Sequence, residues 1–155
     1  MPANLTFYIS EGVLTGTAHG HMVNLTAVSG GGGGSRLHAG SSDTNNPASE
    51  GLKEGSGKHG VRGGPLPSGR YKVLPPSHHR TLGLSARLDP YDHAQAEHMH
   101  GRGGFYIHGR GPRGSDGCIV PMEGFADLMA ALTRDRGGVL LVADRMGGGV
   151  AAPRA

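Results

Sequence analysis

The chain has 155 residues, a length that suits one domain with a modest core. It contains 30 Gly and 10 Pro, only 35% of its residues are hydrophobic, and its single cysteine excludes an internal disulfide. The formal charge of +3 is scattered along the chain, so no nucleic-acid partner is expected, and no apolar stretch approaches the roughly 20 residues of a membrane span.

Short apolar runs separated by glycine-rich segments argue against disorder and are typical of a loop-rich β protein. Near the N-terminus, residues 5–9 and 13–28 are predicted to form the short strands of a hairpin or meander. Residues 29–63 are predicted to form a long flexible loop, because they include the five glycines Gly30–Gly34 and few residues that could enter a core.

A polar stretch at 77–100 interrupts the remaining strands, which are predicted at 70–74, 104–108, 118–120 and 139–143. Between 123 and 132, apolar side chains recur at i, i+3, i+4 and i+7, which predicts a helix with one apolar face. These side chains are Phe125, Leu128, Met129 and Leu132. The sequence therefore predicts a mostly β fold with one helix, in a single domain over residues 1–155.

The only cysteine, Cys118, follows a glycine-lined turn, and His108 ends the strand before that turn. Acyl transfer by a thiol needs a base that generates the thiolate and backbone N–H groups that stabilise an oxyanion. A histidine and a cysteine at the ends of paired strands can face each other, and Gly114 and Gly117 let the turn approach a substrate closely. The alternative is that Cys118 is a small buried hydrophobe and His108 a structural strand-end histidine.

The pair His108-Gly109, followed by Ser115-Asp116-Gly117-Cys118-Ile119, resembles the signature of YkuD-like L,D-transpeptidases. In that family the nucleophilic cysteine lies in a Ser/Thr-x-Gly-Cys motif downstream of a His-Gly. Residues 64–73 are similar to the turn and strand that precede the catalytic region, and the resemblance covers residues 64 to about 143. It implies an L,D-transpeptidase-like β-sandwich with one helix after the catalytic cysteine, without a cofactor or metal.

By this resemblance the protein acts on peptidoglycan stem peptides. Cys118 would attack the carbonyl between the third residue and D-Ala of a tetrapeptide stem and form a thioester, with His108 as base and then acid. The N–H groups of Gly117 and Cys118 are expected to hold the oxyanion, and Ser115 to orient the turn or His108. Further substrate contacts are expected from Tyr106, Gly109, Asp116 and His100. A thiol in this role is expected to be acidic and readily alkylated.

Several features look more like the effector branch of the family, the L,D-transpeptidase toxins exported by type VI secretion systems. The spacing from His108 to Cys118 is shorter than in housekeeping members, and Asp116 stands where they usually have a histidine. No recognisable signal peptide is seen at the start, MPANLTFYIS. The resemblance thus implies synthesis in the bacterial cytoplasm, action in a periplasm after secretion, and the secretion machinery and an immunity protein as partners.

Two alternative interpretations come from other motifs. Gly109-x-Gly111-x-x-Gly114 matches a dinucleotide-binding fingerprint, but Pro112 and the later Cys-Ile-Val run delay the helix that should begin there. The ten histidines, which include His93, His98 and His100, make a metal-binding protein without thiol catalysis the strongest alternative. Because no His-Glu-x-x-His or Cys-x-x-Cys pair is present, these histidines are interpreted as solvated loop residues.

Overall fold

The computed structural model describes residues 2–54 and 62–147. Its nine strands are β1 (Ala3–Tyr8), β2 (Val13–Ala18), β3 (His21–Ser29), β4 (Gly69–Val73), β5 (Ser77–His79), β6 (Gly83–Pro90), β7 (Phe105–His108), β8 (Ile119–Pro121) and β9 (Gly138–Ala143). Helical residues form the short 3-10 turn η1 (Pro47–Ser49) and the helices α1 (His93–Glu97) and α2 (Phe125–Asp135). The predicted mostly β class with one main helix is confirmed. No helix in the described ranges is long and apolar enough to span a membrane.

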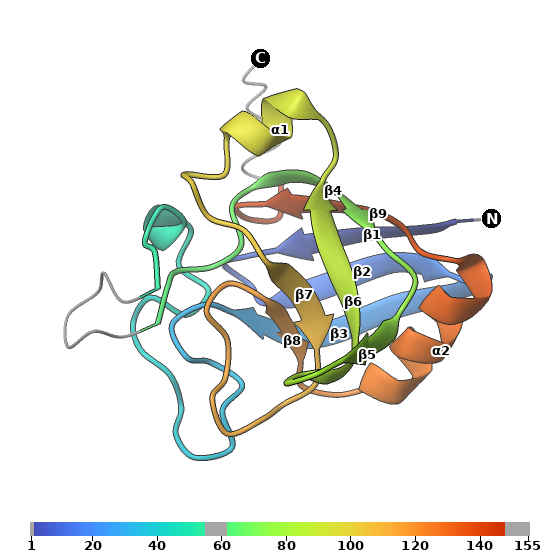
Figure 1. The fold of residues 1–155 in the computed structure, drawn as a ribbon, viewed down its shortest axis with the longest axis horizontal. Coiled ribbons are helices and arrows are strands. Elements are labelled where there is room, and N and C mark those ends of the chain that lie inside the picture. Colours follow the sequence, from blue (N-terminus) through green and yellow to red (C-terminus); the bar gives the residue numbers. More distant parts are fainter. Residues whose placement is uncertain (1, 55–61, 148–155) are drawn as a thin grey trace.

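All these strands belong to one sheet, in the order β4-β9-β1-β2-β3-β8-β7-β6-β5. Strand β4 also pairs with β6, so the sheet closes on itself. Figure 1 shows the resulting two layers, with β5, β6 and β7 in front of β1, β2 and β3. The layers of the expected sandwich are therefore continuous with each other at their edges.

The core lies between these layers and under α2. In β1, Leu5 and Phe7 are fully buried, whereas Thr6 between them is only partly buried and Asn4 before them is exposed, as expected for a strand with one face in the core. Helix α2 follows the predicted apolar pattern and buries one face, formed by Leu128, Met129 and Leu132. This burial fixes the helix that follows the Cys118 segment against the sheet.

No strand or helix was predicted in the polar stretch 77–100, and this was wrong, because the stretch contains β5, β6 and α1. Strand β6 lies between β7 on one side and β5 and β4 on the other, so its backbone hydrogen bonds are satisfied although few of its side chains are large and apolar. Only Ala86 and Leu88 of its apolar residues are deeply buried. The segment 13–28 is likewise two strands, separated by a turn at His19 and Gly20 with positive φ angles.

The glycine run of the predicted loop is part of the packed structure. Residues 30–54 and 62–63 contain no strand, and 55–61 lie outside the described residues. Nevertheless Gly30–Gly34 are all buried. The N–H of Gly32 donates to the carbonyl of Ser115 at 2.8 Å, and the N–H of Gly30 donates to Ser115 Oγ at 3.0 Å. The run therefore supports the turn that leads to Cys118.

Candidate active site

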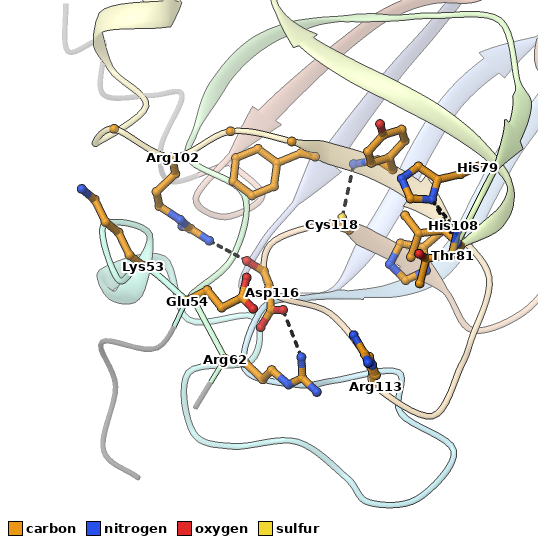
Figure 2. Close-up of a pocket in the computed structure, with 17 residues that line it drawn as sticks. Lys53, Glu54, Arg62, His79, Thr81, Arg102, His108, Arg113, Asp116 and Cys118 are labelled. Carbon is orange, nitrogen blue, oxygen red and sulfur yellow. Dashed lines mark hydrogen bonds and ion pairs between the residues drawn. The ribbon is translucent and has the colours of Figure 1, made fainter. Parts of the chain in front are cut away.

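Two adjacent strands bring His108 and Cys118 to one face of the sheet. Strands β7 and β8 run parallel, and Ile107 pairs with Ile119, both with side chains fully buried in the core. Because side chains alternate along a strand, His108, after Ile107, and Cys118, before Ile119, point to the opposite face. Both line a pocket of about 510 Å³, which Figure 2 shows in close-up. The structure thus brings the two predicted catalytic residues together.

The Cys118 thiol is half-buried and held by the neighbouring strand. Its Sγ accepts a hydrogen bond from the N–H of Tyr106 at 3.3 Å, drawn as a dashed line in Figure 2, and no hydrogen bond joins it to the His108 ring. Burial raises the pKa of Cys118 to about 11, and Asp116 acts in the same direction, whereas the Tyr106 N–H and Arg102 oppose the rise. The expectation of an acidic thiol was wrong, because burial outweighs these two favourable groups.

We expect alkylation of Cys118 by iodoacetamide to be slow at pH 7 and to rise about tenfold for each pH unit toward pH 11, because only the thiolate reacts. The control is the same chain unfolded in urea, whose alkylation rate should level off near an ordinary thiol pKa of about 8.5. A folded-state rate that levels off below pH 8 would show an acidic thiol and contradict the effect of burial.

His108 is placed to act as a neutral base. Its side chain is buried, and Nδ1 lies 2.8 Å from the carbonyl oxygen of Gly109. Since a carbonyl only accepts, Nδ1 carries the proton and Nε2 is left with its lone pair. Burial lowers the pKa of His108 and the charge of His79 contributes to this, whereas the bond to Gly109 opposes it. The group that orients the His108 ring is thus a backbone carbonyl.

Ser115 shapes the turn before the cysteine. Its hydroxyl is fully buried, donates to the carbonyl of Cys118 at 2.5 Å, and accepts from the N–H of Gly117 at 3.1 Å. It makes no hydrogen bond to His108, so its contacts lie within the turn and with the glycine run. Gly117 was expected to supply an oxyanion donor, and in this conformation its N–H is occupied by Ser115 instead.

The turn also requires glycine at two positions. Gly114 and Gly117 have φ angles of 71° and 133°. A Cβ on Gly114 would collide with the carbonyl oxygen of Gly32, and one on Gly117 would collide with the Phe105 ring. These glycines therefore allow the backbone of the turn to pack closely between the glycine run and β7.

We expect Gly114→Ala to lower the free energy of unfolding by about 2 to 4 kcal/mol, the sum of left-handed backbone strain and overpacking against Gly32. Urea unfolding followed by circular dichroism measures the change. Gly111→Ala is the matched control in the same link, because a Cβ there meets nothing within 4 Å and its φ is not positive. Equal stability of the two variants would contradict the supporting role of the glycine run.

Asp116 and two arginines form the opposite wall of the pocket. Asp116 pairs with Arg62 at 3.1 Å, and the N–H of Gly63 donates to its other carboxylate oxygen at 3.3 Å. Arg102 donates to the carbonyls of Gly64, Pro65 and Asp116 at 2.7–2.8 Å, and also to that of Glu50. Burial lowers the pKa of Arg102. The Arg102 guanidinium thus connects the segments around Glu50, Gly64 and Asp116 on one side of the pocket. The sequence pattern did not indicate this role.

His79, at the end of β5, is a further pocket residue that the sequence analysis missed. Its Nδ1 accepts from the N–H groups of Thr81 and Leu82, both at 3.0 Å, so any proton on the neutral ring is on Nε2. The ring lies edge-on to Tyr106, with 4.8 Å between the centroids. It was missed because no strand was predicted in the polar stretch 77–100, where β5 carries His79.

The four predicted substrate contacts are distributed unequally. Tyr106 and Asp116 line the pocket with Cys118. Gly109 lies beyond His108 in an adjoining pocket of about 310 Å³, which also contains Arg113. His100 lines neither of these pockets, and its Nε2 lies 2.9 Å from Glu50 Oε2. The structure therefore places His100 beside Glu50 and not beside His108.

The dinucleotide fingerprint has no matching structure. Residues 109–118 form an irregular link between β7 and β8, and the next helix, α2, begins only at Phe125. A phosphate site of that class needs a helix that starts within the glycine run. The described chain around Gly114 therefore does not support nucleotide binding.

The fold is shared with a solved protein at low sequence identity. Pgp2, the helical cell shape determining protein from Campylobacter jejuni, is similar at a TM-score of 0.54 and 12% identity, over 93% of this chain and 48% of Pgp2. An L,D-transpeptidase from Xylanimonas cellulosilytica (17% identity) and L,D-transpeptidase 1 from Mycobacterium tuberculosis (15%) are similar at a TM-score of 0.48, over 91% of this chain and 60% of theirs. This chain thus spans less than two thirds of each. No family model matches the sequence, and no curated protein is similar to it.

Proposed function

We propose that the chain is a cysteine-dependent L,D-transpeptidase or L,D-carboxypeptidase that acts on tetrapeptide stems of peptidoglycan. The observation that carries this proposal is the placement of Cys118 and the free Nε2 of His108 on one face of β7 and β8, at a shared pocket. The Ser-x-Gly-Cys motif and the fold shared with Pgp2, a cell shape determining protein, support it.

In the first step, Cys118 Sγ bonds to the carbonyl carbon between the third stem residue and D-Ala. The thiol proton passes to Nε2 of His108 and then to the departing amine, so that D-Ala leaves and a thioester forms. A second stem amine, a D-amino acid or water then attacks the thioester carbonyl, the C–S bond breaks, and a proton of the attacking group passes through His108 to the leaving Sγ of Cys118. The attacking group decides between transpeptidation and hydrolysis.

The resting pair is neutral in this mechanism. The pKa of Cys118 is raised and that of His108 is lowered, both mainly through burial, so thiol and imidazole are both uncharged near pH 7. Deprotonation therefore accompanies attack, and the charged imidazolium forms only as the reaction proceeds.

The oxyanion of the tetrahedral intermediate also needs a donor. The N–H of Gly117 already donates to Ser115 Oγ, so we assign this role to the N–H of Cys118. Ser115 also fixes the Cys118 backbone, because its hydroxyl donates to the Cys118 carbonyl. Arg113 and the Arg62–Asp116 pair lie at the same pocket. We assign recognition of the D-Ala carboxylate to Arg113, because a guanidinium can bind a carboxylate through two parallel hydrogen bonds.

The effector role belongs to the same proposal and is supported by the sequence resemblance alone. It comprises export by a type VI secretion system, action in a periplasm, and neutralisation by an immunity protein.

Purified tetrapeptide muropeptides, incubated with the chain and resolved by mass spectrometry, test the proposed activity. We expect loss of the mass of one D-Ala residue from the stems, as free tripeptide or as new cross-links at the third residue. Cleavage at any other bond, or no change with a folded chain, would contradict the proposal.

A further inference from the structure

Three side chains from two separate segments converge away from the Cys118 pocket. Nε2 of His100 lies 2.9 Å, and Nε2 of His98 lies 3.4 Å, from the same oxygen, Oε2 of Glu50. The ligand atoms of all three residues lie within 4.8 Å of one another. Two histidines and one carboxylate are a common donor set for Zn²⁺ in proteins.

The spacing of these atoms suits a single small ion. With bonds of about 2.0–2.1 Å and tetrahedral angles, neighbouring ligand atoms around Zn²⁺ are about 3.3 Å apart. The separations of 2.9 and 3.4 Å lie close to that value, so small rotations of the rings would suffice. The His98 and His100 side chains are 51% and 38% exposed and that of Glu50 is 16% exposed, so an ion can enter from solvent.

The backbone around the ligands holds them in place. The N–H of Ser68 donates to Glu50 Oε1 at 3.0 Å, which fixes the carboxylate and leaves Oε2 turned to the histidines. His98 is the C-terminal cap of α1, and His100 has a left-handed backbone with a φ of 56°. A left-handed conformation is costly for a residue with a side chain, and here it turns the His100 ring toward Glu50.

Without an ion, this arrangement brings two imidazole rings to one carboxylate oxygen. Their ring centroids are 5.4 Å apart, and two protonated rings at that separation would repel each other. A bound cation removes this repulsion, because both rings coordinate it in their neutral form. The carboxylate of Glu50 balances part of the charge of the cation. The alternative is an ion pair between the Glu50 carboxylate and one protonated histidine, and the experiment must distinguish this ion pair from a metal site.

We propose that Glu50, His98 and His100 bind one Zn²⁺ ion, with a fourth position open to solvent. Glu50 belongs to the segment that continues to Lys53 and Glu54, and His100 to the segment that continues to Gly101–Gly104, all at the rim of the Cys118 pocket. The ion therefore fastens two walls of that pocket to each other. This site is independent of the thiol chemistry proposed for Cys118.

The test measures Zn²⁺ binding in a Cys118→Ala background, so that the thiol cannot contribute, by competition with a chromophoric chelator at pH 7.5. We expect one Zn²⁺ per chain and a rise in Tm of about 5 °C or more at a hundredfold excess of Zn²⁺ over its Kd. His98→Gln and His100→Gln should each weaken binding by about tenfold or more, which reduces the rise at the same Zn²⁺ concentration by about half or more.

His93→Gln is the matched control, because His93 is an exposed histidine on α1 that pairs only with Glu97. It should leave the Zn²⁺ affinity and the Tm rise unchanged. The proposal would be overturned by absence of stoichiometric binding, by binding that survives both His98→Gln and His100→Gln, or by an equal loss in His93→Gln. The Tm of each variant without Zn²⁺ shows whether the fold is intact, so a folding defect is not mistaken for loss of the site.

Discussion

Cys118→Ala is expected to reduce the release of D-Ala from tetrapeptide stems by about 10⁴-fold or more, to the level of the reaction without protein. The thiol is the only group at the pocket that the proposed mechanism uses as a nucleophile, and loss of a nucleophile removes the covalent route entirely. Mass spectrometry of muropeptides after timed incubation measures the loss.

Folding of this variant is checked separately, because Cys118 packs against the hydrophobic core and its Sγ accepts a hydrogen bond from the Tyr106 N–H. Cys118→Ser keeps a hydrogen-bond acceptor there and should unfold at nearly the same urea concentration as the wild type. It should still lose activity, because a hydroxyl beside a neutral histidine is a much weaker nucleophile than a thiol. Turnover retained by a folded Cys118→Ala variant would exclude the proposed mechanism.

His108→Gln is expected to lower kcat/KM by about 10²- to 10⁴-fold, the usual range for loss of a general base. The wild type should lose activity as pH falls through the folded pKa of His108, because the protonated ring cannot accept the thiol proton. Burial lowers that pKa, so this acidic limb lies below the ordinary histidine value of about 6.5. In His108→Gln the limb should disappear, which a pH profile of kcat/KM measures.

His78→Gln is the matched control for this measurement. His78 is an exposed histidine in β5 and does not line the pocket. Its replacement should leave both kcat/KM and the acidic limb unchanged. An unchanged limb in His108→Gln would assign the titration to another group, with His79 the nearest candidate at the pocket, and would contradict the role of His108 as base.

The strands and the helix with clear apolar patterns could be predicted from the sequence. Burial alternates along β1 and β9 and follows one face of helix α2, whereas β7 and β8 are short apolar runs that are buried almost throughout; a local pattern of apolar residues predicts both kinds of element. Strand β6 could not be predicted in this way, because its stability comes from pairing with strands on both sides and not from its own side chains. Helix α1 did carry a local signal, since Asp92 caps it by accepting from the N–H of Gln95 at 2.9 Å.

The candidate site was predictable where neighbours in sequence are also neighbours in space. Cys118, His108 and the turn at Ser115 lie within eleven residues and on adjacent strands, so a short motif contains them. The contacts of Arg102 and His100 with the segment around Glu50 join residues about fifty positions apart, which no local pattern expresses. The raised pKa of Cys118 likewise depends on three-dimensional burial, which is why an acidic thiol was wrongly expected.

The most direct test of thiol catalysis is capture of the acyl-enzyme. The wild-type chain is mixed with tetrapeptide muropeptide, quenched in acid after milliseconds to seconds, digested, and mapped by mass spectrometry. We predict a stem acyl group lacking D-Ala, attached to the peptide that contains Cys118 and removed by hydroxylamine as a thioester would be. Turnover of the same substrate with no acyl group on Cys118, or with the acyl group on another residue, would contradict the assignment of Cys118 as the nucleophile.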